Sequence, residues 1–386
     1  MTDDEDEASS GRRKLLLYVH GFDPRGPGVL HDLQRQDAVG STDFGGAFRV
    51  GRRRREPHSS VWRIDADWPE GVVSTEFVAF RWDDLVRARW GRSLRAQAGG
   101  LARWLAAYWR TGTFGALISA SRTTRLAVLA LPAAVLAFCV AAGLAAAFAS
   151  WALALAAARV GLPTAAGLGG LAVLALAPSL WRRFDRWANL CWLGRGHLHM
   201  VDLSQGRIPE LDERLQAFSD RLIVEAASGR WEDIIVVGHS SGSIHAVDVV
   251  GRALMRHEGL GHSGTPIRLI TIGHCIAPYA KLGPAPSWSR ALDALVAADD
   301  IGWTDISAPA DPGAAGVWHP LLHTPHQHDI GRVRRLSPHF HRALSPERFR
   351  TLKRDPMAYH FQYMRSSDHP EVYDWRRIAF GPDRMS

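Results

Sequence analysis

One stretch decides the fold of this chain: Ile234-Ile235-Val236-Val237-Gly238-His239-Ser240-Ser241-Gly242-Ser243-Ile244-His245. An apolar, β-branched run leads into the pattern G-x-S-x-G, after which apolar residues recur at helical spacing at Ile244, Val247, Val250 and Leu254. This order predicts a buried strand, a sharp turn and a helix. The two glycines allow the backbone to cross at close quarters, so that the turn lifts the Ser240 hydroxyl above the sheet, where a base can reach it.

A second motif lies near the N-terminus, where the buried run Leu15-Leu16-Leu17-Tyr18-Val19 ends in His20-Gly21-Phe22. As a pair, the two motifs resemble those of the α/β-hydrolase family, over roughly residues 12–84 and 205–375. The resemblance implies that Ser240 is a nucleophile and that the backbone N–H groups of Phe22 and Ser241 form an oxyanion hole. The positions that support the motifs are His20, Gly21, Gly238, His239 and Gly242.

The order of strands and helices predicts the fold class. Residues 72–82 form a second strand pattern after a loop-rich segment, and further buried runs follow the helix of the first motif at 267–273 and 301–307. Leu211, Leu215, Phe218 and Leu222 mark one face of an amphipathic helix before the Ser240 strand. We therefore expect an α/β-hydrolase fold with a doubly wound, mostly parallel sheet, and with a helical insertion between its two parts, residues 12–84 and 205–386.

Composition narrows the class of protein. The chain has 386 residues, which is long enough for one large α/β domain with an insertion, or for two domains. Its net charge is +7. Its first residues are acidic and do not fit a signal peptide, so residues 1–11 are expected to form a disordered tail. The three cysteines are far apart and indicate neither a disulfide framework nor a metal site.

The insertion has the composition of a membrane segment. Residues 85–124 are rich in Arg, Trp, Ala and Leu, which suits either an amphipathic helix at a membrane surface or one packed on the hydrolase domain. No charged residue lies between Arg125 and Arg159, and a second uncharged run extends over 160–181. We predict two transmembrane helices in residues 125–181 and an interfacial connection at 182–204; a buried Ala-rich hairpin in a soluble cap is the alternative.

The charges that flank the two runs predict an orientation. Arg122 and Arg125 precede the first run, and Arg182, Arg183 and Arg186 follow the second. The positive-inside rule places both flanks, and with them the catalytic domain, in the cytoplasm. The expected membrane is a prokaryotic-type plasma membrane, because the sequence shows no organelle targeting signal. The lipid bilayer is the predicted partner. The separate basic run Arg52–Arg55 is interpreted as a solvated face rather than an anionic-lipid site.

An activated serine needs a histidine base and a carboxylate that orients it. In the implied order Ser, acid, His, the preferred acid is Asp311 in the loop after residues 301–307; Asp305, inside that run, is the alternate, and a surface role for Asp311 stays open. The preferred base is His360, because Tyr359-His360-Phe361-Gln362-Tyr363 resembles the H-x-x-Y of lipase-like members, at the start of a closing helix. His341, after a candidate last strand at 332–336, is the alternate.

Other histidines receive more ordinary interpretations. His239 and His245 are expected to pack or hydrogen-bond locally. Four histidines in the loop at 319–328 could hold zinc, but two prolines and the lack of a helix favour a loop cluster without metal. We predict no metal and no cofactor, because the chain has neither a Walker motif nor a dinucleotide fingerprint.

These patterns predict a membrane-anchored serine hydrolase that cleaves an ester, thioester or amide through an acyl-enzyme, with lipid-like or other small-molecule acyl esters favoured by the position at a bilayer. The alternative is a catalytically inert, hydrolase-like module for membrane-tethered binding or assembly. That alternative predicts that no histidine lies within hydrogen-bond reach of Ser240. A nucleic-acid partner is disfavoured because the positive charge gathers beside the apolar runs.

Overall fold

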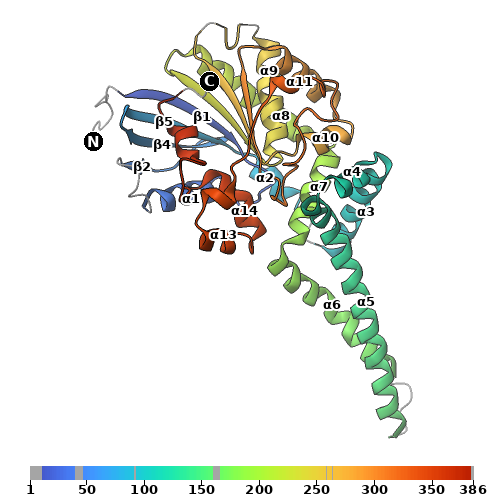
Figure 1. The fold of residues 1–386 in the computed structure, drawn as a ribbon. Coiled ribbons are helices and arrows are strands. Elements are labelled where there is room, and N and C mark those ends of the chain that lie inside the picture. The colour runs from blue at the N-terminus through green and yellow to red at the C-terminus, as the bar shows by residue number, and fades with distance from the viewer. Residues whose placement is uncertain are drawn as a thin grey trace. The chain divides into compact units, whose positions relative to one another are not determined.

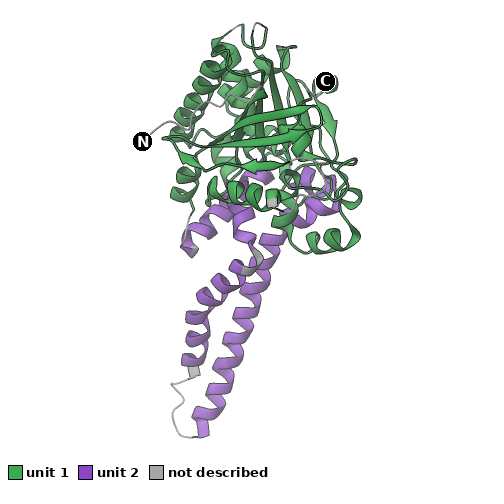
Figure 2. Cartoon of the chain, turned by 90° about the vertical axis from the view of Figure 1, so that its left-hand side faces the viewer, with its two compact units in different colours: residues 1–90, 111–113, 199–386 green, residues 91–110, 114–198 purple. Residues whose placement is uncertain are grey.

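The computed structural model describes residues 11–39, 47–90, 93–159, 166–257, 259–262 and 264–383, so the acidic tail, apart from Gly11, lies outside it. The chain divides into two compact units (Figure 2): unit 1 contains residues 1–90, 111–113 and 199–386, and unit 2 contains residues 91–110 and 114–198. Unit 1 carries the sheet and unit 2 is helical. The insertion expected from composition is therefore a separate compact unit.

Unit 1 is a mixed α/β structure around one nine-stranded sheet (Figure 1). Its strands are β1 (Arg12–Val19), β2 (Phe48–Val50), β3 (Arg54–Arg55), β4 (Ser59–Trp68), β5 (Gly71–Phe80), β6 (Asp233–His239), β7 (Ile267–Ile272), β8 (Gly302–Ile306) and β9 (Arg334–Leu336). Their order is β2-β4-β5-β1-β6-β7-β8-β9, with β3 paired to β4. Within the sheet order β5-β1-β6-β7-β8-β9, every neighbouring pair is parallel. The prediction of a mostly parallel sheet is therefore confirmed.

The expectation of a loop-rich segment before the second predicted strand is wrong. Strands β2, β3 and β4 occupy much of it, all antiparallel to their partners. In β4 the buried Trp62, Ile64 and Ala66 alternate with charged residues, and β4 joins β5 through a tight turn at Gly71, whose φ is 125°. The charges in this run hide its period of two, which is why composition suggested a loop.

Helices cover both faces of the sheet. On one face α9 (Gly242–Arg256) contacts β6 and β7 and packs against α8 (Pro209–Ala227) and α11 (Pro286–Ala297). On the other, Leu16 and Tyr18 share an apolar cluster with α1 (Gly28–Val39) and the C-terminal helices. The remaining helical elements of unit 1 are α2 (Asp83–Ala88), α10 (Ile276–Lys281), η2 (Ile330–Arg332), α12 (Phe340–Ala343), α13 (Pro346–Leu352), α14 (Pro356–Phe361), η3 (Gln362–Met364) and α15 (Trp375–Phe380). The predicted helix at 211–222 is confirmed as α8.

Unit 2 is built around the 38-residue helix α5 (Arg122–Arg159), which packs along α6 (Ala166–Ala188). Its other helices are α3 (Leu94–Arg110), most of α4 (Thr113–Ala120) and the first part of α7 (Leu190–Ser204). Among the described residues α5 alone is long and apolar enough to cross a membrane, and only 11 % of its most apolar window is buried. This exposure distinguishes α5 from the core helix of a soluble protein.

The structure does not support the second predicted transmembrane helix. Within the described residues, α6 begins at Ala166 and meets its first charge at Arg182. At 1.5 Å per residue, this uncharged part is roughly 24 Å long, shorter than the hydrocarbon core of about 30 Å. The first six residues of the predicted run, 160–165, lie outside the description.

A close helix crossing in unit 1 gives a test of the packing. A Cβ atom on Gly251 of α9 would lie 2.5 Å from the backbone carbon of Ala291 in α11. Because backbone cannot move aside as a flexible side chain can, we expect Gly251→Ala to destabilise the fold by about 1–3 kcal/mol. Thermal unfolding of the full-length protein in a nonionic detergent measures the effect.

The matched control is Gly28→Ala in α1, where a Cβ would make only ordinary contact, 3.7 Å from Arg53. This substitution should leave the unfolding midpoint unchanged or slightly raised. Equal midpoints for the two variants would contradict the close crossing of α9 and α11.

Candidate active site

The strand, turn and helix predicted around Ser240 are confirmed. Strand β6 ends at His239 and α9 begins at Gly242, with Ser240 between them at a φ of 58°. A non-glycine residue rarely adopts this left-handed conformation, so the turn holds Ser240 under strain. The Ser240 N–H donates to the Ile272 carbonyl at 2.9 Å, and Ser243 Oγ donates to the Ser240 carbonyl at 2.6 Å.

Both glycines of the motif are required by close packing. A Cβ on Gly238 would lie 2.7 Å from the Gly242 carbonyl oxygen. A Cβ on Gly242 would lie 2.6 Å from the His20 carbonyl oxygen. The turn therefore fits only because neither position carries a side chain, and it presses against the end of β1.

The two sequence motifs meet at one place in the sheet. Strands β1 and β6 are parallel neighbours, and the chain proceeds from β1 to one side of the sheet and from β6 to the other. At such a point the connections diverge and leave a crevice at the carboxyl ends of the strands. A Cβ on Gly21 would lie 3.3 Å from Ser240 Oγ, so the His20-Gly21-Phe22 backbone approaches the serine directly.

The predicted oxyanion donors follow from this approach. Phe22 comes one residue after Gly21, and Ser241 comes one residue after Ser240 at the start of α9. Their N–H groups therefore belong to the two segments that meet at Ser240. Binding of a developing oxyanion by these groups stays a prediction.

The preferred acid and base lie together although they are 49 residues apart in the chain. His360 Nδ1 and Asp311 Oδ2 are 2.8 Å apart, and the Asp311 carboxylate is fully buried. Tyr363 Oη donates to the same oxygen at 2.9 Å, and the Gly313 N–H donates to Asp311 Oδ1 at 2.8 Å. Because a carboxylate only accepts, His360 Nδ1 carries the proton, which leaves Nε2 as the basic nitrogen of the neutral ring.

His360 is in the last turn of α14, not at the start of a closing helix as expected. The alternates lie elsewhere. His341 is exposed on α12 beside the rings of His339 and Phe349, and the described residues show no hydrogen bond from it to Asp311.

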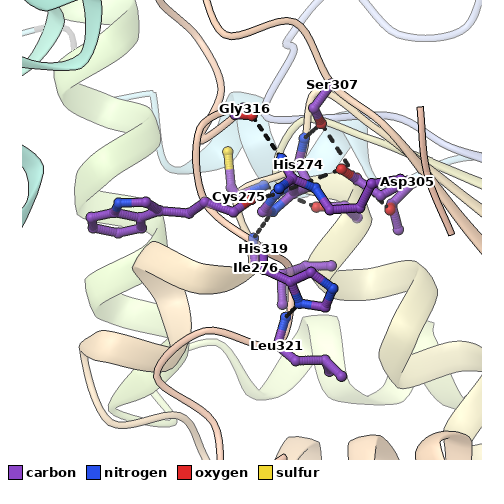
Figure 3. A network of polar contacts seen from close by, with 12 residues as sticks. His274, Cys275, Ile276, Asp305, Ser307, Gly316, His319 and Leu321 are labelled. Carbon is purple, nitrogen blue, oxygen red and sulfur yellow. Dashed lines mark hydrogen bonds and ion pairs between the residues drawn. The ribbon is translucent and has the colours of Figure 1, made fainter. Parts of the chain in front are cut away.

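Asp305 belongs to a separate buried network (Figure 3). It accepts from Thr271 Oγ1 at 2.8 Å and from Ser307 Oγ at 3.3 Å, and His274 Nε2 lies 3.9 Å from its second oxygen. His274 in turn bonds the Trp318 carbonyl through Nε2 at 3.1 Å, and its own carbonyl accepts from the Ala315 N–H at 2.9 Å. This network attaches the loop that follows Asp311 to the end of β7.

Ser240 is not directly joined to the base. Between these two described residues there is no hydrogen bond, which agrees with what the inert alternative predicts. Catalytic hydrogen bonds are often long in unliganded enzymes and tighten in the substrate complex, so this geometry does not remove His360 as a base.

Cys275 is a neighbour of Ser240 that the sequence analysis did not identify. Its N–H donates to Ser243 Oγ at 3.1 Å, and its thiol points to the Gly313 carbonyl at 3.7 Å. Burial raises the pKa of the thiol to about 12, against the opposing effect of the Ser240 hydroxyl. Cys275 follows the end of β7, next to β6, so the rule that carboxyl ends of parallel strands share an edge could have found it.

His239 hydrogen-bonds locally, as predicted. Its Nε2 lies 3.0 Å from the His360 carbonyl oxygen and its Nδ1 lies 3.3 Å from Tyr18 Oη. Burial is the main cause that holds the pKa of His239 well below its usual value. The residue before the serine thus connects the turn to the backbone of the predicted base.

Three more imidazoles, those of His20, His199 and His245, are buried around Trp82. His20 stacks on the indole, His245 meets it edge-on, and His199 lies 3.3 Å from His245 through their Nε2 atoms. Burial lowers the pKa of all three, and that of His199 to about 3. These rings are therefore neutral at pH 7 and pack as uncharged groups, as expected for His245.

No set of three or more metal-ligating side chains comes together within the described ranges. In the histidine loop, His326 pairs with Asp293 and Asp329, His319 accepts from the Leu321 N–H, and His323 packs edge-on to Trp318. These rings bind different neighbours rather than converge.

No protein-family model, curated protein or solved structure matches this chain.

The buried imidazoles predict how stability depends on pH. The pKa values of His20, His199, His239 and His245 are lower in the folded state than the usual 6.5, so the unfolded chain binds more protons. Their contribution is complete above pH 6.5 and is lost as the pH falls below that value. Each such histidine changes the free energy of unfolding by up to about 1.4 kcal/mol per pH unit.

Thermal unfolding at pH 7.5, 6.5 and 5.5 measures this loss. We expect the midpoint to fall with pH, and to fall less steeply in His199→Gln. The exposed His341→Ala should keep the wild-type slope. Buried carboxyls with a raised pKa, such as Asp248 and Asp374, act in the opposite direction, so a midpoint that rises toward pH 5.5 would show that they dominate and contradict this account.

Proposed function

We propose that the protein is a membrane-anchored serine hydrolase that cleaves acyl esters through a covalent acyl-enzyme. The observation that carries the proposal is the strained Ser240 turn beside a buried, hydrogen-bonded Asp311–His360 pair. A serine hydroxyl is a weak nucleophile until a base removes its proton. His360 is that base, and its hydrogen bond to Asp311 fixes its tautomer.

Each residue then has one role. Ser240 Oγ attacks the carbonyl carbon while His360 Nε2 accepts the hydroxyl proton, and the Phe22 and Ser241 N–H groups bind the oxyanion. His360 returns that proton to the leaving alcohol, and the acyl group stays on Ser240. Water, deprotonated by the same nitrogen, then attacks the acyl carbon, and His360 returns this proton to Ser240 Oγ as the acid leaves.

Asp311 stabilises the imidazolium that forms on His360. The bonds from Tyr363 and Gly313 support this role, because they satisfy the remaining acceptor positions of a carboxylate that has no contact with water. A carboxylate fixed in this way holds the imidazole ring in one orientation during both proton transfers.

The exposed apolar helix α5 supports the anchoring. We propose that α5 inserts into the bilayer with α6 packed along it, and that the α/β unit lies in the cytoplasm, because Arg122 and Arg125 lie at the start of α5 and basic flanks favour that side. An active site tethered to a bilayer favours lipid-like acyl esters as substrates.

One observation favours a second candidate, an inert hydrolase-like binding module. This is the lack of a hydrogen bond between Ser240 and His360 in the unliganded geometry. Chemical reactivity of Ser240 separates the two candidates.

Labelling by a fluorophosphonate probe tests the proposal on the full-length protein in nonionic detergent. The wild type should be labelled, Ser240→Ala should not, and His360→Ala and Asp311→Asn should be labelled slower by about 10³–10⁴-fold, because the base or its orientation is lost. Rates of fluorescence incorporation provide the measurement.

The control is His341→Ala, an exposed histidine on a nearby element, which should be labelled at the wild-type rate. If the folded wild type and Ser240→Ala are equally unlabelled, the inert module is correct. Slower labelling of His341→Ala together with wild-type labelling of His360→Ala would instead assign the base to His341.

A further inference from the structure

The net positive charge of the chain comes from unit 2. Its sequence contains eleven arginines and no lysine, against one acidic residue, Asp185. This gives unit 2 a net charge of +10, although the whole chain carries only +7. The α/β unit is therefore slightly acidic, and the basic pI of the protein comes from the helical unit alone.

Contacts within unit 2 show where the exposed part of the long helix begins. The first turns of α5 are packed, with Thr124, Ala127, Val128 and Leu131 buried. A Cβ on Gly194 of α7 would collide with Leu131, so α7 covers this end. Beyond it, Ala146 and Ala157 are the buried residues of α5.

The rings of Phe138 on α5 and Trp181 on α6 lie 5.2 Å apart and mark the boundary. Farther along, α5 and α6 remain in contact, because a Cβ on Gly169 would lie 2.8 Å from the backbone carbon of Ala149. Small residues of this kind allow close packing of helices in a membrane. Figure 2 shows the two helices side by side in unit 2.

Beyond this boundary the two helices expose an apolar belt. From Phe138 to Arg159, α5 extends for roughly 31 Å at 1.5 Å per residue, close to the thickness of a hydrocarbon core. The exposed large side chains of the belt are Val140, Leu144, Phe148, Trp151 and Leu155 on α5, and Leu168, Leu171, Leu174, Leu176 and Leu180 on α6.

Three arginines lie next to this boundary on its other side. Arg182, Arg183 and Arg186 follow Trp181 within five residues and are exposed. Arg122 and Arg125 are also exposed, but they precede Phe138 by 16 and 13 residues, about 20 Å or more along α5, and so lie away from the boundary. The single acid among them, Asp185, accepts from the Cys191 N–H at 2.7 Å, at the start of α7. The positive charge next to the belt is therefore not balanced by carboxylates of unit 2.

We propose that Arg182, Arg183 and Arg186 form a basic collar that binds the headgroups of anionic phospholipids. This inference rests on the proposed insertion of α5 and deepens it by naming the lipid class. A guanidinium forms paired hydrogen bonds with phosphate oxygens, and a row of basic residues at a membrane surface selects anionic over zwitterionic lipid. Nucleic acid fits less well, because the collar directly adjoins an apolar belt of bilayer thickness.

The test uses the full-length protein in nonionic detergent, titrated with dioctanoylphosphatidylglycerol or dioctanoylphosphatidylcholine. Bound lipid is counted by native mass spectrometry. The collar variant carries Arg182→Gln, Arg183→Gln and Arg186→Gln. The matched control carries Arg52→Gln, Arg53→Gln and Arg55→Gln, which removes the same charge from an exposed basic run of unit 1.

The wild type and the control should retain phosphatidylglycerol in preference to phosphatidylcholine by about tenfold or more, and the collar variant should lose most of this preference. Raising the salt to 0.5 M should weaken it, because exposed charges are screened. An equal loss in the control, no preference in the wild type, or collar-dependent binding of a DNA duplex without lipid preference would overturn the proposal.

Carbonate extraction of membranes from expressing cells tests the insertion of α5 separately from lipid binding by the collar. Full release of the wild type would refute the insertion of α5, and with it the collar. Retention in the membrane without preference for phosphatidylglycerol would refute the collar alone. Fluorophosphonate labelling, which reports on the active site, is independent of both results.

Discussion

The close approach of two backbones at the ends of β1 and β6 is the constraint on which the site depends. Gly242 lies against the His20 carbonyl, and Gly21 lies against Ser240, so neither segment has room for a side chain. This crossing holds Ser240 at its positive φ and brings the His20-Gly21-Phe22 backbone next to its side chain. The strain is tolerated because β1 and β6 are buried, hydrogen-bonded neighbours in the middle of the sheet.

The second half of the site depends on the burial of one carboxylate. Asp311 comes from a loop, yet its side chain is out of contact with water and accepts from Tyr363, Gly313 and His360. A buried charge is stable only when its acceptor positions are satisfied, so these partners fix the loop as much as the loop fixes His360. The Asp305–His274 network keeps the following loop on β7 and so supports the same arrangement.

The sequence predicts features that depend on residues close together in the chain better than features that depend on residues far apart in it. The β6 strand, the turn and α9 are local patterns, and they were predicted in place. The observed pairing of Asp311 with His360 matches the preferred acid and base, because the order of strands limits which loops can meet. Strand β4 was missed since charges mask its alternation, and the described uncharged part of α6 is shorter than the predicted span. Cys275 and the Tyr363 bond depend on which strand ends are neighbours, which spacing along one chain does not reveal.

An experimental structure of the protein inactivated by a small alkyl phosphonate would test the central claim most directly. We expect phosphorus bonded to Ser240 Oγ and a phosphoryl oxygen within about 3.1 Å of the Phe22 and Ser241 nitrogens. We also expect His360 Nε2 within hydrogen-bond distance of Ser240 Oγ or of an alkoxy oxygen on the phosphorus. An adduct on another residue, or a phosphoryl oxygen directed away from both N–H groups with His360 unmoved, would contradict it.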